Sequence, residues 1–302
     1  MAVIKSPHKL TEVELYQTLE KIVEMPEKRL KTMIKQGGTN AIDEVFLLHL
    51  GQRVPQFLTA TLVNLTQVLL LQKDYFRGHP IWKPLEVELH RRRNNLNNEQ
   101  LAKVVHAFGV TGNASRFLFC ELETTIVDSP IAIETEHLLK ILSGFAVADQ
   151  GEPVLYSHVE GILLHRGLDT LSVPQVLQVC KDFKRATNFP PGAKFFHAAE
   201  KHLSGLIHSG KLREDKIGED GEKAEQKGLY RIASTCFESN IGSNAFQSLL
   251  EQKLCEEHWN CENLQEHVLL LKSLVDYKIK SESFERLLYA STLEKAGEFT
   301  VK

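Results

Sequence analysis

Three consecutive arginines, Arg91, Arg92 and Arg93, are the side chains whose type and spacing suggest a chemistry most directly. Asn94 and Asn95 follow them. Guanidinium groups bind phosphate or carboxylate oxygens bidentately, and an asparagine amide can hydrogen-bond a base edge. The cluster therefore predicts a contact with RNA or with an acidic partner. The alternative is a solvated group of cations at a helix C-terminus, where the helix dipole favours positive charge.

A second basic group, Lys181, Lys184 and Arg185, opens a stretch over 181–215 that contains seven basic and four acidic residues. Residues 81–120 have a similar excess, with six basic residues against three acidic ones. Between them, 121–180 contains nine acidic and two basic residues. This alternation favours several protein contacts of opposite sign over one continuous RNA track.

Metal binding and catalysis have weaker support in the residue pattern. Cys255, His258, Cys261 and His267 lie close together, but no second pair of ligands completes the spacing of a structural zinc site. The 13 histidines could act as acids or bases, but the sequence contains no glycine-rich phosphate loop, no nucleophile elbow and no His-Glu-x-x-His motif. We therefore expect no enzyme activity, no cofactor and no metal site.

The overall composition excludes several other classes of protein. The 302 residues have a net charge of −3 and are 42% hydrophobic, which is typical of a folded protein and lacks the basic bias of a nucleic-acid coat. Five cysteines, an odd number, favour reduced thiols and an intracellular, reducing compartment. No apolar run approaches the length of a membrane span, so we expect no membrane insertion.

A sequence repeat sets the elements that must position these side chains. In Leu101–Phe108, Leu138–Phe145 and Val176–Phe183, an aliphatic residue lies seven positions before a phenylalanine, and the phenylalanines are 37 and 38 residues apart. Weaker copies of the pattern are Leu62–Leu69, Tyr230–Phe237 and Leu270–Tyr277. Each repeat contains two stretches with apolar residues three or four apart, which predicts two antiparallel helices.

The predicted fold is all-α, an α-solenoid of about six two-helix repeats of roughly 37–40 residues. We divide it into an N-terminal helical cap over 1–54, helical repeats over 55–212, a polar insertion over 213–228, and further repeats with a C-terminal cap over 229–302. Two aromatic segments, Phe195-Phe196 and the loop with Tyr75-Phe76 and Ile81-Trp82, could bind a partner, but such residues are more often part of the core.

The first helix of the repeat resembles a known group of families. The pattern is an aliphatic residue, then paired Leu or Val, then Ala or Gly beside Phe, and it occurs at Leu101–Gly109 and Leu138–Ala146. It is similar to the first helix of the octotricopeptide and heptatricopeptide repeats and of the FASTK-like helical domain. The resemblance covers residues 55 to 290. It implies an α-solenoid of organelles, commonly mitochondria, that handles RNA or serves in ribosomes.

Two functions follow as expectations. The first is a non-catalytic scaffold or adaptor subunit that binds protein subunits of a larger, mitochondrial assembly, and the alternating charge favours it. The second is a mitochondrial RNA-binding or ribosome-associated protein, part of a ribonucleoprotein complex. In that case the phosphates would be contacted by the six cations of the two basic groups: Arg91, Arg92, Arg93, Lys181, Lys184 and Arg185.

Overall fold

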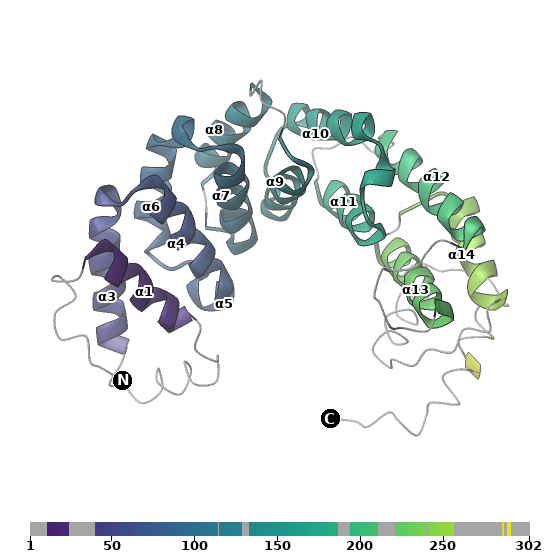
Figure 1. Cartoon of the computed structure of the whole chain (residues 1–302), viewed down its shortest axis with the longest axis horizontal. Coiled ribbons are helices and arrows are strands. Elements are labelled where there is room, and N and C mark those ends of the chain that lie inside the picture. The colour runs from purple at the N-terminus through teal and green to yellow at the C-terminus, as the bar shows by residue number, and fades with distance from the viewer. Residues whose placement is uncertain are drawn as a thin grey trace. The chain divides into compact units, whose positions relative to one another are not determined.

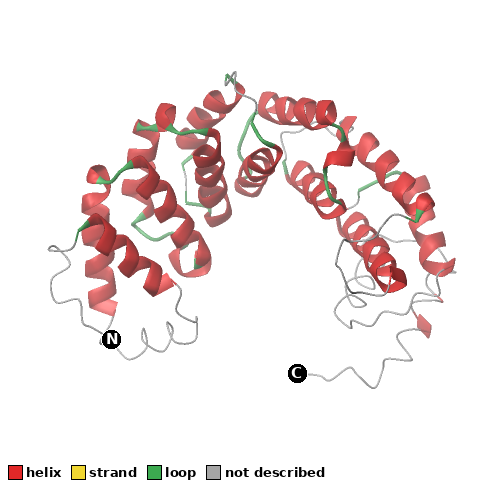
Figure 2. Cartoon of the chain, in the orientation of Figure 1, coloured by secondary structure: helices red, strands yellow, loops and turns green. Residues whose placement is uncertain are grey.

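The computed structural model is all-helical within the residues it describes (Figures 1 and 2). These are residues 11–23, 40–113, 115–128, 133–186, 194–210, 221–239, 241–256, 286 and 289–290. The chain divides into two compact units, which we describe separately. The first comprises Met1–Val159 with Arg185–Asn188, and the second comprises Glu160–Lys184 with Phe189–Lys302. The all-helical prediction is confirmed for the described residues.

The helices of the first unit form two layers. One layer contains α1 (Glu12–Val23), α4 (Thr59–Leu71), α7 (Asn98–Thr111) and α9 (Thr135–Ala148), which pack side by side in that order. The other contains α3 (Asn40–Arg53), α6 (Trp82–Arg91) and α8 (Arg116–Val127), again packed in chain order. Short helical segments at Val54–Gln56, α5 (Lys73–Phe76) and Arg93–Asn95 connect the layers, and α10 begins at Pro153.

Local signals in the sequence set the bounds of α7 and α8. Asn97 caps α7 by accepting the Gln100 N–H, and the Gln100 side chain accepts the Asn97 N–H in return. Gly112 ends that helix with a φ of 65°, a left-handed conformation that glycine adopts at low cost. The Ser115 hydroxyl then accepts the Leu118 N–H and begins α8.

The repeat residues form the core of the first unit. Leu101, Phe108, Leu138 and Phe145 are all buried, as is the weaker pair in α4. Phe108 meets Trp82 of α6 edge to face with ring centroids 4.9 Å apart, and Phe119 of α8 meets Phe145 at 5.0 Å. The repeat phenylalanines of α7 and α9 therefore each pack against an aromatic ring of the other layer.

Helices α7 and α9 approach each other closely because glycines face each other between them. A Cβ on Gly109 would overlap the carbonyl oxygen of Gly144, and a Cβ on Gly144 would lie 2.6 Å from the carbonyl oxygen of Val105. Each glycine adjoins the repeat phenylalanine of its helix in the sequence. The two backbones are thus in direct contact at the point where the two repeats meet.

The second unit contains the end of α10 (Pro153–Arg166), a 3₁₀ turn at Leu168–Thr170, and four further helices. These are α11 (Val173–Arg185), α12 (Lys194–Ser209), α13 (Gly221–Ser239) and α14 (Asn244–Glu256). The repeat residues of α11 and α13 are buried, and Phe183 contacts Phe195 with ring centroids 5.2 Å apart. Phe195 and, in the first unit, Ile81 and Trp82 are core residues, as predicted.

Several sequence predictions fall wholly or partly outside the described residues, among them the helical caps over 1–54 and at the end of 229–302. The Leu270–Tyr277 repeat copy is another. The polar insertion over 213–228 is described only from Gly221, where α13 begins, so its last eight residues form the first two turns of that helix.

We expect Gly144→Ala to lower the free energy of unfolding by about 1–3 kcal/mol or more, because the methyl group would force α7 and α9 apart. The measurement is urea unfolding followed by circular dichroism. Gly205→Ala is the matched control, since it lies within α12 with no atom within 4 Å of the added Cβ. That control should be neutral or raise stability by up to about 1 kcal/mol. Equal losses in both variants would contradict the close approach.

We also expect Phe145→Ala to cost about 3–5 kcal/mol, because it empties a fully buried ring site. Phe117→Ala removes the same side chain from an exposed position in α8 and should change stability by less than about 0.5 kcal/mol. Thermal and urea unfolding of both variants provides the comparison. A Phe145→Ala variant as stable as the parent would show that the repeat register is wrong.

Candidate interaction surface

The arginine cluster lies at the C-terminus of α6, and its members have different environments. Arg91 is exposed and donates to both carboxylate oxygens of Glu88, with Nε–Oε2 and Nη2–Oε1 distances of 3.1 and 2.5 Å. Arg92 is largely buried, with 17% of its side chain exposed, and also binds Glu88. One buried carboxylate therefore holds two of the three guanidinium groups.

Arg92 joins the end of α6 to the stretch of chain that precedes α4. Its guanidinium donates to the carbonyl oxygens of Phe57 at 2.6 Å and Pro55 at 3.0 Å, at the start of α4. Arg93 pairs with Glu121 of α8 at 2.8 Å and donates to the carbonyl oxygen of His90. Both arginines are thus bound within the fold, which leaves Arg91 as the member of the cluster that reaches solvent.

Neither sequence interpretation of this cluster included Glu88. The signal was present, because Glu88 lies three and four residues before Arg91 and Arg92, the spacings at which helix side chains meet. The contacts to Pro55 and Phe57 span 37 and 35 residues and follow from the packing of α6 on α4.

The second basic group lies at the end of α11. Lys184 and Arg185 are exposed and Lys181 is half-buried. The three residues share one helix, but the division between the two units falls between Lys184 and Arg185. The structure brings Arg91–Arg93 together in one place and Lys181–Arg185 in another.

A set of buried glutamates repeats along the second-layer helices of the first unit. Glu86 of α6 accepts the Ser115 N–H at 2.8 Å, at the residue that caps α8. Glu123 of α8 accepts the Glu152 N–H with both oxygens, at 3.1 and 3.2 Å, just before α10 begins. Each carboxylate thus satisfies an N–H group at the N-terminus of the helix two further along the chain, α8 for Glu86 and α10 for Glu123.

The second unit contains the same contact twice. Glu160 of α10 accepts the Phe195 N–H at 2.7 Å in the first turn of α12. Glu200 of α12 accepts the Ser243 N–H at 3.0 Å, immediately before α14. The four glutamates are 37, 37 and 40 residues apart in the sequence, close to the repeat length. This interval is visible in the sequence, but the apolar repeat pattern does not include these positions.

The two glutamates of the first unit titrate in opposite directions. Burial opposes ionisation of Glu86, but hydrogen bonds from Ser115 and the ion pair with Lys83 outweigh it, so its pKa lies below the ordinary value. Burial raises the pKa of Glu123, and the single N–H group of Glu152 offsets this only in part. The number of donors around each carboxylate decides the sign.

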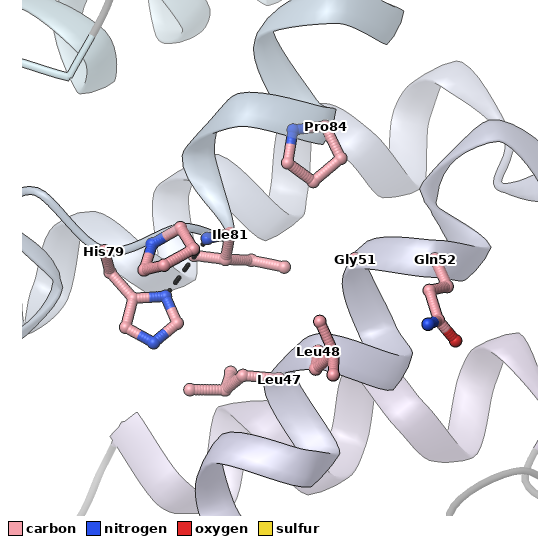
Figure 3. A pocket seen from close by; sticks show the side chains of 8 residues that line it. Leu47, Leu48, Gly51, Gln52, His79, Ile81 and Pro84 are labelled. Atoms are coloured by element: carbon pink, nitrogen blue, oxygen red, sulfur yellow. Dashed lines mark hydrogen bonds between the residues drawn. The ribbon is translucent and has the colours of Figure 1, made fainter.

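An apolar pocket of about 640 Å³ opens between α3 and α6 (Figure 3). Leu47 and Leu48 of α3 lie opposite Ile81 and Pro84, and the chain before α6 contributes His79. The lining is completed by Gly51, Gln52 and Pro80. The Ile81 N–H donates to Nδ1 of His79 at 3.1 Å, so the ring orientation is set by the backbone and Nε2 carries the proton of the neutral ring. A pocket of this size and lining suits an apolar side chain.

The described part of the chain holds no group of three or more metal-ligating side chains. The Cys255–Cys261 segment extends beyond the described residues, so the prediction for it stays open to test. Burial raises the pKa of the Cys180 thiol to about 12 and raises that of Cys236 as well, so both thiols stay protonated and unreactive. Among the described helices, none combines the length and the hydropathy that a membrane span requires.

Comparison with known proteins adds no family assignment, because no family model and no curated protein matches the chain.

The glutamate contacts predict opposite pH dependence for two variants. Glu86 has a lowered pKa, so its stabilising effect is present above the ordinary value of 4.5 and is lost as the pH falls through the lowered pKa. Glu123 has a raised pKa, so its effect is full below 4.5 and is lost as the pH rises through the raised pKa. On acidification from about pH 7 to about pH 3, the stability deficit of Glu123→Gln should grow as the pH falls through the raised pKa, and that of Glu86→Gln should shrink once the pH is below 4.5.

Urea unfolding of both variants and the parent across this range provides the measurement. At neutral pH we expect Glu86→Gln to cost about 1–3 kcal/mol, the usual range for a hydrogen bond to a charged group. Glu136→Gln is the control for the loss at neutral pH, because that glutamate is exposed and pairs with Lys140 of its own helix. Parallel pH profiles for Glu86→Gln and Glu123→Gln would contradict the assignment.

Proposed function

We propose that the protein is a non-catalytic helical-repeat scaffold or adaptor subunit of a larger assembly, with an α-solenoid architecture. The observation that carries the proposal is a glutamate that accepts an N–H group at the start of the helix two further along the chain, twice in each unit. A contact that recurs at the repeat interval is what stacked two-helix units require, because each unit must bury its face on its neighbour. Proteins built in this way offer extended surfaces for partners.

The use of the arginines supports protein partners over RNA. Arg92 and Arg93 donate to carbonyl and carboxylate oxygens of the fold, so their guanidinium groups are already occupied. A phosphate would have to compete with these contacts. The apolar pocket between α3 and α6, by contrast, is of the kind that receives a hydrophobic anchor of a protein partner.

The second candidate is RNA binding, which the exposed Lys184 and Arg185 favour together with Arg91. A mitochondrial location follows only from the resemblance of the first-helix pattern to organellar repeat families. The two candidates differ in what holds their partners. Phosphate contacts weaken steeply with salt, whereas an apolar interface tolerates it.

Affinity purification of the full chain from the cells that express it, with and without ribonuclease, separates these functions. For a scaffold we expect defined protein subunits to stay bound after ribonuclease at moderate salt, identified by mass spectrometry. A tagged chain carrying Lys184→Gln and Arg185→Gln is the matched variant and should retain the same subunits. Loss of all partners on ribonuclease treatment, with RNA recovered from the untreated sample, would overturn the scaffold function in favour of RNA binding.

A further inference from the structure

We propose that the solvent side of α3, α6 and α8 is a docking surface for an acidic segment of a partner protein that inserts an apolar side chain between α3 and α6. This inference rests on the proposed scaffold function and names the chemistry of its partner. The surface is defined by three exposed apolar residues, Leu48, Val87 and Phe117, and by three cations, Lys83, Arg91 and Arg116.

The apolar part of the surface runs across the three helices. Leu48 of α3, Val87 of α6 and Phe117 of α8 are 65%, 57% and 61% exposed, large values for such side chains. Leu48 and Pro84 line the pocket, and Val87 lies one turn beyond Pro84 on α6. The Phe117 ring lies against the ring of His90, with centroids 4.8 Å apart, which links α6 to α8 at this face.

The charge of this surface follows from the glutamate contacts. On α6 and α8, Glu86, Glu88 and Glu123 are buried, where they accept hydrogen bonds from N–H or guanidinium groups. Glu121 pairs with Arg93. The carboxylates of the two helices are therefore turned inward or paired, although they equal or outnumber the cations of each helix.

The cations of the same helices reach solvent. Lys83, Arg91 and Arg116 have 72%, 67% and 77% of their side chains exposed. Lys83 and Arg91 pair with carboxylates that lie beneath them, and Arg116 has a 3.5 Å contact to Glu152. Glu152 is itself 58% exposed, so the outward positive charge of this surface is that of Lys83 and Arg91, whose carboxylates are buried, and an acidic partner complements it.

The apolar residues favour a protein segment over a nucleic acid. Leu48, Val87 and the pocket offer aliphatic contact that a phosphate backbone cannot use, whereas an acidic amphipathic segment presents both kinds of group. A pocket beside exposed apolar residues and a rim of charge is the usual anatomy of a hot spot.

The test places a photo-cross-linking amino acid, p-benzoylphenylalanine, at Phe117 of the full chain in the cells that express it. Mass spectrometry then identifies the cross-linked segment. We expect an acidic segment with at least one large apolar side chain. A synthetic peptide of that segment, measured by fluorescence anisotropy, should bind at least tenfold more weakly to Val87→Asp/Phe117→Asp and to the triple variant Lys83→Gln/Arg91→Gln/Arg116→Gln.

Leu71→Asp is the control, because Leu71 is equally exposed but lies on α4, in the other layer. It should leave peptide affinity unchanged, and circular dichroism confirms that each variant is folded. A cross-link to RNA, to a second copy of this chain or to a basic segment would overturn the proposal, as would the absence of any cross-link.

The failure of this inference is distinguishable from failure of the scaffold function. If ribonuclease-resistant subunits remain bound equally to the parent and to Val87→Asp/Phe117→Asp, the scaffold function stands and the docking surface is wrong. If no protein subunit resists ribonuclease in the parent, the scaffold function itself fails.

Discussion

The N-terminus of a helix leaves N–H groups without partners inside the helix, and here a glutamate of the helix two before it in the chain supplies an acceptor. Glu86 and Glu123 do so in the first unit, Glu160 and Glu200 in the second. The contact fixes where each second-layer helix begins relative to its predecessor. The phenylalanine packing and the glycine contact between α7 and α9 then set the spacing of the other layer.

The same contact shapes the surface. A carboxylate that caps a buried helix end is removed from solvent, so the charge that a partner meets differs from the formal charge of the helix. In α6 and α8 this leaves arginines and a lysine facing outward above buried glutamates. Counting charges along the sequence could not reveal this difference, because it depends on which side chains the packing buries.

Much of the fold could be predicted from the sequence, because a phenylalanine that recurs every 37 or 38 residues, within stretches of helical apolar spacing, is typical of two-helix repeats. The burial of Phe108, Phe145 and Phe183 is confirmed. The contacts of the candidate site could not be predicted from the sequence in the same way. Arg92 donates to backbone carbonyl groups 35 and 37 residues away. Every residue has a carbonyl group, so the sequence does not indicate which of them accepts. The solenoid arrangement, the partners and the mitochondrial location stay predictions.

The glutamate accepts a hydrogen bond from a backbone N–H group, so the contact does not require a particular side chain at the donor residue. Its partners are Ser115, Glu152, Phe195 and Ser243, and they lie 29, 29, 35 and 43 residues beyond the glutamates. Between each glutamate and its donor the chain contains a further α-helix, which is α7, α9, α11 or α13. The same contact therefore forms with intervening stretches of chain that differ by up to 14 residues in length, so it sets no fixed length for the segment that it closes.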